Sequence, residues 1–402
     1  SSYATIIPTS ASWVALGGPY TIPTMSMSVD AVFTNTVPVD AYRGAGRPEA
    51  AYLLERVVDL AAQEMGIDPL ELRQRNYIRS FPHKNALGML IECGAFAENL
   101  ELAGKHADFE TFEARCRVSE KSGKLRGRGV SSYLELTLGM PADDSEIRFD
   151  DDGGITMLVG GASTGQGHET AYRQIINDEL GIAPDKVRYL QGDTGLLPSG
   201  GGHGGSRSLK IVGSSLFNAA GEVRNKGMVA AAHVLEAAVD KIEFRDGLFA
   251  VAGTNRKIDV LELEEALRNM HDLPKGVPVT LTSKGHFQRE ANSFPNGVHI
   301  AEVEVDPETG AVKLERFTVV DDFGRIINPL IAEGQVAGGA VQGIGQAMLE
   351  GVVYDEDGQL ISGSFMDYAM PRADDLSTID VTFNQDHPSK TNPLGVKGAG
   401  EA

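Results

Sequence analysis

The segment Gly160-Gly161-Ala162-Ser163-Thr164-Gly165-Gln166-Gly167-His168-Glu169-Thr170 decides how the middle of the chain is organised. Before it, alternating runs at 146–150 and 155–159 flank an Asp-Asp-Gly-Gly turn and predict a β-hairpin. After it, apolar residues recur at a 3.6-residue spacing as far as Leu180 and predict an amphipathic helix. A glycine-rich helix N-terminus offers unpaired N–H groups to an anion or polar ligand, and a tight structural turn is an equally favoured alternative.

The same order of glycine loop and helix recurs within about 50 residues. The glycine-dense segment 199–208 precedes a long Ala-rich helix that should end near Val239. It also contains Ser206, Arg207 and Ser208, and hydroxyl, backbone N–H and guanidinium groups are the donors that phosphate oxygens prefer. A mobile surface loop is the alternative.

The remainder mixes helices with antiparallel pairs and has no regular βαβ alternation, which is typical of an α+β fold with two lobes. A β-rich run at 29–39 leads into a glycine turn. The next helix should bury Leu53, Leu54, Val57, Val58, Ala61 and Met65, because these residues share one face. Asp68-Pro69-Leu70-Glu71 predicts a capped helix start. Further on, the pattern predicts a hairpin at 298–305 and 311–320, a helix at 329–350 and a strand at 378–383.

Composition excludes several classes of protein. The chain has 402 residues, 42% of them hydrophobic, and a net charge of -20, from 56 acidic and 36 basic residues. Such a charge disfavours binding to nucleic acid or anionic membranes, and no apolar run reaches the roughly 18 residues of a membrane span. The two cysteines, Cys93 and Cys116, lack the paired spacing of a zinc or iron–sulfur site, so we expect free thiols and a cytoplasmic location.

Two further segments are rich in small residues. In the segment 334–345, five glycines lie on a predicted helix, although each costs roughly 1 kcal/mol relative to Ala. Either a bulky ligand approaches that backbone or the helix packs closely against another element. At 397–402, the single carboxylate of Glu401 stands between small residues. A general base next to a ligand is one interpretation, and a flexible, solvated C-terminus is the other.

Four of these segments together resemble the molybdopterin-binding large subunit of the xanthine oxidase family, specifically its carbon monoxide dehydrogenase-like and aldehyde oxidoreductase-like members. They are Asp40–Arg47, Gly165–Thr170, Asn328-Pro329 followed by Gly334-Gln335, and Lys397–Glu401, in the order and spacing of the family. The resemblance covers essentially the whole chain and corresponds to the C-terminal portion of that subunit. It implies a partial first molybdopterin-binding lobe at 1–122 and a second lobe at 123–402.

The resemblance also implies a cofactor and a reaction. The cofactor is molybdenum–molybdopterin, commonly the cytosine dinucleotide form in bacteria, and its dithiolene holds the metal, so no side chain is a metal ligand. Glu401 is the base that deprotonates the hydroxyl ligand of the metal as its oxygen attacks an electron-poor carbon of an aldehyde or N-heterocycle, while hydride passes to the sulfido ligand. The residues expected to bind the cofactor are Arg43, Gly44, Ala45, Gly165, Gln166, Gly167, His168, Ser206, Ser208, Gln335, Lys397, Gly398 and Gly400. The substrate pocket is expected to include Ala45, Ser132 and Tyr133.

Departures from the family pattern narrow the substrate. Copper-containing carbon monoxide dehydrogenases carry Cys where Gly44 stands, so a copper bridge is not expected here. Xanthine oxidases place Phe at the position of Ala45, which weakens the case for a purine. The upstream glycine-rich loop of the family and the short tail after its catalytic Glu do not occur in these residues. Either a companion chain carries the N-terminal half of the large subunit, or only the C-terminal half is present.

Electrons must leave such a site through other groups. Two cysteines cannot ligate an iron–sulfur cluster, so the resemblance implies an iron–sulfur subunit and an FAD subunit as partners. A small molecule is the expected substrate. The rival hypothesis is a non-catalytic or degenerate subunit that binds the cofactor or assists assembly of a molybdoenzyme complex.

Overall fold

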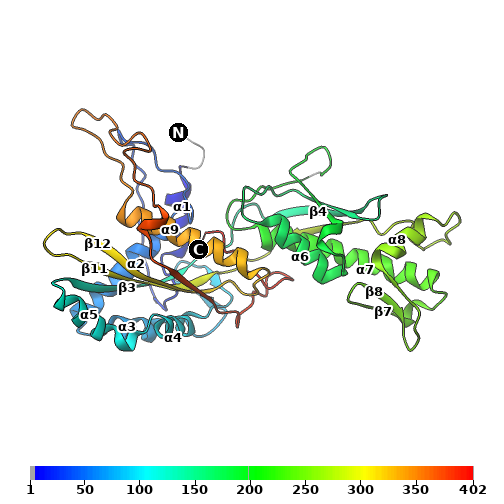
Figure 1. The fold of residues 1–402 in the computed structure, drawn as a ribbon, viewed down its shortest axis with the longest axis horizontal. Coiled ribbons are helices and arrows are strands. Elements are labelled where there is room, and N and C mark those ends of the chain that lie inside the picture. Colours follow the sequence, from blue (N-terminus) through cyan, green and yellow to red (C-terminus); the bar gives the residue numbers. More distant parts are fainter. Residues whose placement is uncertain (1–4, 198, 402) are drawn as a thin grey trace.

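The computed structural model describes residues 5–197 and 199–401 as an elongated α+β molecule with two lobes (Figure 1). The longer helices are α1 (Ile7–Ala15), α2 (Arg47–Met65), α3 (Pro69–Asn76), α4 (Phe96–His106), α5 (Phe112–Lys121), α6 (His168–Leu180), α7 (Ser214–Val234), α8 (Val260–Arg268) and α9 (Pro329–Met348). The strands are β1 (His83–Lys84), β2 (Leu90–Ile91), β3 (Leu125–Leu134), β4 (Ala142–Phe149), β5 (Ile155–Val159), β6 (Val187–Gln191), β7 (Ile242–Arg245), β8 (Leu248–Val251), β9 (Lys257–Asp259), β10 (Ser283–Gln288), β11 (Asn296–Val305), β12 (Val312–Asp322) and β13 (Ile379–Phe383).

The first lobe is a sheet with helices on both faces. Its strand order is β13-β12-β11-β3, with antiparallel pairing except for the parallel pair β12 and β13. Because side chains alternate along β11, Val298 and Ile300 point to the face that α4 covers. Val319 of β12 packs on the opposite face against Val336 of α9. Figure 1 shows α2 to α5 on one side of this sheet and α9 on the other.

The second lobe contains the sheet β10-β4-β5-β6, which α6 and α7 cover. A small sheet, β7-β8-β9, and α8 extend from it (Figure 1). The core joins Ile155, Met157 and Val159 of β5 to the apolar face of α6. Gly227 of α7 is required here, since a Cβ at that position would lie 2.1 Å from the ring of Phe249.

The C-terminal segment joins the two lobes. Leu394 and Val396 are buried in the hydrophobic cluster of the second lobe. The next residue, Lys397, donates its backbone N–H to Phe323 of the first lobe at 2.8 Å. The hydrophobic cluster of the first lobe contains residues from 15–138 together with residues from 294–320, so it brings together distant parts of the chain. The predicted division at residue 122 stays a prediction.

Most of the predicted elements are confirmed. The hairpins β4–β5 and β11–β12, and the helices α2, α6 and α9, lie close to the predicted positions. Asp68 caps α3 as predicted, by accepting hydrogen bonds from the N–H groups of Leu70 and Glu71. The long Ala-rich helix is preceded by a π-helical turn, Leu209–Gly213, and ends at Val234.

One prediction in the first lobe is wrong, and another is confirmed only in part. The β-rich run at 29–39 forms no strand and is exposed, since no neighbouring strand pairs with it. In α2, Leu54 and Val58 pack against the core as predicted, but Leu53, Val57 and Met65 are exposed. The helix instead buries Glu55 and Ala62, because Glu55 forms an ion pair with buried Arg73 and accepts a hydrogen bond from Tyr20.

Candidate functional site

Arg43 connects three parts of the first lobe that are distant in sequence. Its Nε donates to the carbonyl of Gly400 at 2.7 Å, and its Nη2 donates to the carbonyl of Gln335 on α9, also at 2.7 Å. Its Nη1 donates to Oε1 of Gln342, about two helical turns further along α9, at 3.4 Å. Burial lowers the pKa of Arg43, and the charge of Glu401 partly offsets this shift. The guanidinium group therefore holds the C-terminal segment against α9.

The loop that carries Arg43 has an unusual backbone. Gly44, Ala45 and Gly46 all have positive φ, at 94°, 45° and 95°. A Cβ on Gly44 would lie 2.4 Å from the ring of Pro48, in the first turn of α2, so this position requires glycine. Ala45 is buried in this turn. The loop therefore presents Arg43 and Arg47 close together at the start of α2.

Glu401 lies where these elements meet. Its Oε2 accepts a hydrogen bond from Ser206 Oγ at 3.0 Å and forms an ion pair with Nη2 of Arg47 at 3.3 Å. The side chain is 17% exposed, so it is partly accessible. No hydrogen bond is recorded for its Oε1 within the described part of the chain. One oxygen is thus fixed and the other is available to a ligand.

Behind Glu401 lies a second carboxylate. Glu135, directly after β3, is buried and accepts hydrogen bonds from Nε of Arg47 at 2.8 and 2.9 Å. Burial raises the pKa of Glu135 to about 7; Arg47 opposes this shift and the charge of Glu401 adds to it. Arg47 therefore lies between two carboxylates and links Glu401, the candidate base, to the buried Glu135.

The second glycine loop packs closely on the C-terminal segment. A Cβ on Gly398 would lie 2.3 Å from the carbonyl oxygen of Ser206, and one on Gly400 would lie 3.0 Å from its Oγ. The N–H of Gly398 donates to Oγ1 of Thr137 at 3.0 Å. Ser206 itself has a φ of 55°. The small residues around Glu401 are thus explained by this close approach.

The other polar residues of that loop face inward. Ser208 is buried, and its carbonyl accepts a hydrogen bond from the Tyr172 hydroxyl at 3.3 Å. Arg207 is fully buried in an ion pair with Asp143 at 2.9 Å. Arg207 therefore stabilises the loop and is not available to a phosphate. This corrects the prediction that the guanidinium group of this segment is one of its phosphate donors.

The first glycine loop ends at the N-terminus of α6. Gly167 has a φ of 77°, and a Cβ there would lie 2.8 Å from Ile331, so this N-terminus approaches the first turn of α9. Gln166 accepts hydrogen bonds from Ser163 and Thr164 through its Oε1. Gly165, with a φ of 115°, is exposed.

His168 in the first turn of α6 is unusual. Its Nδ1 is buried and has no hydrogen-bond partner among the residues that the structure describes. Burial lowers the pKa of His168 to about 4, and nearby His203 adds to the shift, so the ring is neutral at pH 7. A buried polar atom without a partner at a helix N-terminus is a position where a polar ligand would fit.

The glycines of α9 mostly face open space. A Cβ on Gly334 or Gly343 would meet nothing within 4 Å, and one on Gly338 would meet only Nη1 of Arg43. Gly345 is the contrasting case, because a Cβ there would lie 2.5 Å from Pro371. Close packing within the described chain thus explains Gly345 but not the other three positions. The side chain of Gln335 lies beside them and is partly exposed.

The remaining predicted residues separate into two groups. Lys397 is fully buried in an ion pair with Asp322 at 2.6 Å, so it anchors the C-terminal segment. Ser132 and Tyr133 lie on opposite faces of β3: Ser132 hydrogen-bonds with Tyr77 in the core at 2.6 Å, and Tyr133 donates to Asp321 at 2.9 Å. The two side chains therefore point to opposite faces of the strand, and the substrate pocket of Ala45, Ser132 and Tyr133 stays a prediction.

Sequence reasoning gave no role to Arg47 or Glu135. Arg47 belongs to the quoted loop motif, but nothing in the motif indicates its partner. Glu135 stands between Leu134 and Leu136, and a lone carboxylate within an apolar run was the available signal. Buried carboxylates usually have a cationic partner, which would have directed attention to an arginine.

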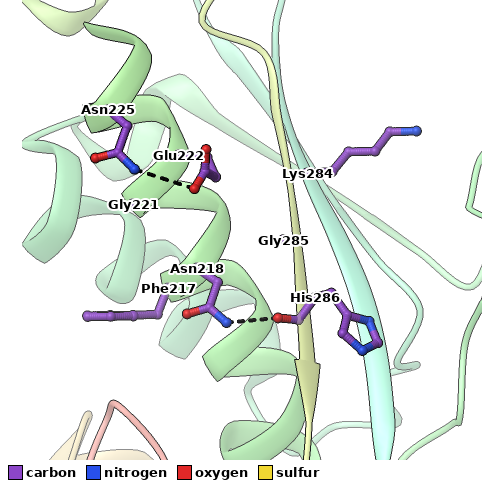
Figure 2. A pocket seen from close by; sticks show the side chains of 8 residues that line it. All are labelled: Phe217, Asn218, Gly221, Glu222, Asn225, Lys284, Gly285 and His286. Carbon is purple, nitrogen blue, oxygen red and sulfur yellow. Dashed lines mark hydrogen bonds between the residues drawn. The ribbon is translucent and has the colours of Figure 1, made fainter. Parts of the chain in front are cut away.

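The hollow drawn in Figure 2 lies elsewhere. It has a volume of about 400 Å³, lies between α7 and β10 in the second lobe, and contains none of the predicted site residues. Its polar groups are partly satisfied locally, because Asn218 donates to the carbonyl of His286 and Asn225 donates to Glu222. Across the described ranges, no group of three His, Cys, Asp or Glu residues could hold a metal ion. None of the helices described here is long and apolar enough to cross a membrane.

Comparison with known proteins shows the family of the chain. Two models of a molybdopterin cofactor-binding domain match residues 1–77 and 102–377. The chain is 35% identical to subunit gamma of the 6-hydroxypseudooxynicotine dehydrogenase complex of Paenarthrobacter nicotinovorans, and the match covers 96% of this chain and 49% of that protein. It is 32% identical to the carbon monoxide dehydrogenase large chain of Hydrogenophaga pseudoflava, over 96% and 50%.

A solved structure agrees with these matches. Quinoline 2-oxidoreductase from Pseudomonas putida 86 superposes with a TM-score of 0.92 at 34% identity, over 100% of this chain and 53% of that one. The chain belongs to the molybdopterin-binding domains of the xanthine oxidase family. It spans about half the length of the curated relatives that it matches.

The residues present fit such a cofactor. Molybdopterin is an anionic, bulky ligand, and the buried Nδ1 of His168 lies at a helix N-terminus without a partner. A Cβ on Gly338 would lie 3.7 Å from Nη1 of Arg43, so the open face of α9 at Gly338 is next to this guanidinium group. His168 follows Gly167, which approaches Ile331 in the first turn of α9, and both features suit a ligand that follows the backbone closely.

Proposed function

We propose that the chain is the part of a molybdenum hydroxylase large subunit that holds the molybdopterin and supplies Glu401 as the base. The observation that carries this proposal is the convergence at Glu401 of Arg47, Ser206 and the C-terminal segment held by Arg43. The reaction would be oxidation of an electron-poor carbon, with the oxygen coming from water. The bound cofactor would supply the oxidising chemistry and accept the two electrons that leave that carbon.

Each residue around Glu401 then has a definite role. Arg47 and Ser206 fix Oε2 of Glu401, which leaves Oε1 to accept the proton from the attacking oxygen. A positioned carboxylate needs no further movement before it accepts the proton, which favours catalysis. Arg43 maintains the distance between this carboxylate and α9 through its contacts with Gly400 and Gln335.

The cofactor contacts are proposed from the same geometry. His168 Nδ1 and the N–H groups at the start of α6 would face polar atoms of the pterin or of its cytosine dinucleotide phosphates. Gln166 and Gln335 would contact the cofactor from two sides. Ser206 is already engaged with Glu401, and we therefore assign it to positioning the base.

The relatives favour an N-heterocycle over an aldehyde as substrate. Nicotine 6-hydroxylase of Paenarthrobacter nicotinovorans, 33% identical to this chain, and quinoline 2-oxidoreductase are both named for nitrogen heterocycles. Carbon monoxide is disfavoured despite the similarity to carbon monoxide dehydrogenases. Gly44 provides no thiolate for a copper ion in the loop next to Glu401.

The proposal includes partners. Cys93 and Cys116 are both without a disulfide and lie in different surroundings, so a cluster on this chain is not expected. Iron–sulfur and FAD subunits would carry the electrons away, and the polypeptide corresponding to the other half of the relatives would complete the large subunit. We expect the assembly to be cytoplasmic.

Glu401→Gln tests the proposal in the purified complex. We expect loss of heterocycle-dependent dye reduction while molybdenum and pterin contents stay at wild-type levels. Glu243→Gln, at an exposed position of β7, is the matched control and should keep full activity. Near-normal turnover of Glu401→Gln would remove its role as the base. Bound cofactor without turnover in the wild-type complex would instead favour a non-catalytic cofactor-binding or assembly subunit.

A further inference from the structure

Two segments of the first lobe expose an unusual number of apolar side chains. We call residues 29–42 and 352–370 together the apolar arm. Phe33 and Met366 are almost completely exposed, and Phe365 is 80% exposed. The exposed large apolar residues of the arm are Val29, Val32, Phe33, Val37, Val39, Tyr42, Val352, Val353, Ile361, Phe365, Met366 and Met370. Exposed apolar side chains gathered on two neighbouring segments are typical of an interaction site.

The arm also contains almost no regular secondary structure. Residues 29–42 contain no helix or strand, and residues 352–370 form turns with one isolated bridge between Tyr354 and Leu360. The two segments meet where the N–H of Val37 donates to the Tyr354 hydroxyl at 2.9 Å. Figure 1 shows a blue segment and an orange-red segment that extend together away from the sheet of the first lobe. Long segments without secondary structure are uncommon in compact domains, and binding loops are one of their usual functions.

The arm is continuous with the candidate site. Tyr42 directly precedes Arg43, and at the other end Pro371 packs against Gly345 of α9. Tyr368 of the arm donates to Glu350, just after α9, at 3.0 Å. A protein that covers the arm would therefore also lie next to α9, whose Gly334 and Gly343 face open space.

The charge of the arm restricts the partner. Residues 29–42 contain two acidic residues and residues 352–370 contain four, and neither segment contains Lys or Arg. The matching surface should be an apolar groove with Lys or Arg at its rim, because opposite charges at the edge favour docking in one orientation. A second copy of this chain, with its net charge of -20, would be a poor match.

We propose that the apolar arm is the docking surface for the polypeptide that corresponds to the half of the curated relatives that this chain does not span. The lengths of the relatives favour this occupant, because this chain matches only about half of each of them. Docking there closes the open side of the site next to Arg43 and α9. The inference rests on the proposed function only for this closure; the docking itself does not depend on turnover.

The test uses the 402-residue chain co-expressed with the polypeptide that matches the other half of the gamma subunit. Phe33→Asp/Met366→Asp places two charges at the most exposed apolar positions, and we expect about tenfold or more weaker association in a co-purification titration. Val279→Asp, at an exposed apolar position outside the arm, is the control and should associate normally. The unfolding temperature of each free variant should match that of the wild type.

Hydrogen exchange provides the second measurement. Amides of 29–42 and 352–370 should exchange rapidly in the free chain and become protected in the complex. Unchanged association of the double variant, or protection that arises from self-association of the free chain, would overturn the proposal. If association depends on the arm but the complex lacks molybdenum or turnover, the docking inference stands and the proposed function fails.

Discussion

Replacing Arg43 by Met should release the C-terminal segment that carries Glu401. The substitution retains much of the apolar stem but removes the donors to Gly400, Gln335 and Gln342. Hydrogen bonds from a charged group contribute about 1.5–3 kcal/mol each. The two bonds of 2.7 Å therefore contribute at least about 3 kcal/mol to local order, which corresponds to roughly a 100-fold change in the local opening equilibrium.

Hydrogen exchange measured by mass spectrometry follows this opening directly. We expect peptides that cover 396–401 to exchange roughly 100-fold faster in Arg43→Met, since exchange from the open state reports its population. Arg43→Lys keeps the charge but cannot reproduce the planar fork, so its exchange should be intermediate. Arg117→Met, an exposed arginine of α5, is the control. Wild-type exchange at 396–401 in Arg43→Met would refute the role of Arg43 in holding this segment.

Three further substitutions test other parts of the structure. Gly398→Ala should destabilise the protein by about 1–3 kcal/mol, because its Cβ would overlap the backbone of the 199–208 loop. Gly343→Ala is the control and should not destabilise the protein, because a Cβ there faces open space. Chemical unfolding of the two variants measures the difference. Burial raises the pKa of Glu135 to about 7, so the folded state binds the proton of this carboxyl more tightly than the unfolded state does. This group therefore makes the unfolding free energy fall by about 3 kcal/mol between pH 4.5 and 7. Glu135→Gln should remove that fall, and a pH profile identical to that of the wild type would contradict the prediction. Burial lowers the pKa of Lys210 to about 8, so the charged form of this side chain disfavours folding. The unfolding free energy should therefore rise by about 2 kcal/mol between pH 8 and 10. Urea titrations of Lys210→Met should not show this rise.

The local structure was largely predictable. Helices such as α6 and α9 and the hairpins β4–β5 and β11–β12 follow from the spacing of apolar residues and from glycine turns, which act over a few positions. The same local rules were not sufficient for α2. Its apolar residues suggested one buried face, but only part of that face, including Leu54 and Val58, packs against the core, and Glu55 is buried beside them through its ion pair with Arg73.

The candidate site depended on contacts between distant residues. The sequence indicated Arg43, the 199–208 loop and Glu401 only separately and through a family resemblance. Ser206 and Glu401 are 195 positions apart, and Arg43 and Gly400 are 357 apart, so no local pattern brings them together. The roles of Arg47 and Glu135 likewise became visible only with their ion pair.

Residue periodicity thus determined which segments are helices, strands and glycine loops, because backbone geometry repeats over two or 3.6 residues and needs no distant partner. Tertiary packing alone decided that Glu401 lies beside Arg47 and Ser206, and that the apolar residues of 29–42 stay exposed. The reason is that burial and ion pairing depend on which surfaces meet when the two lobes and the C-terminal segment fold together.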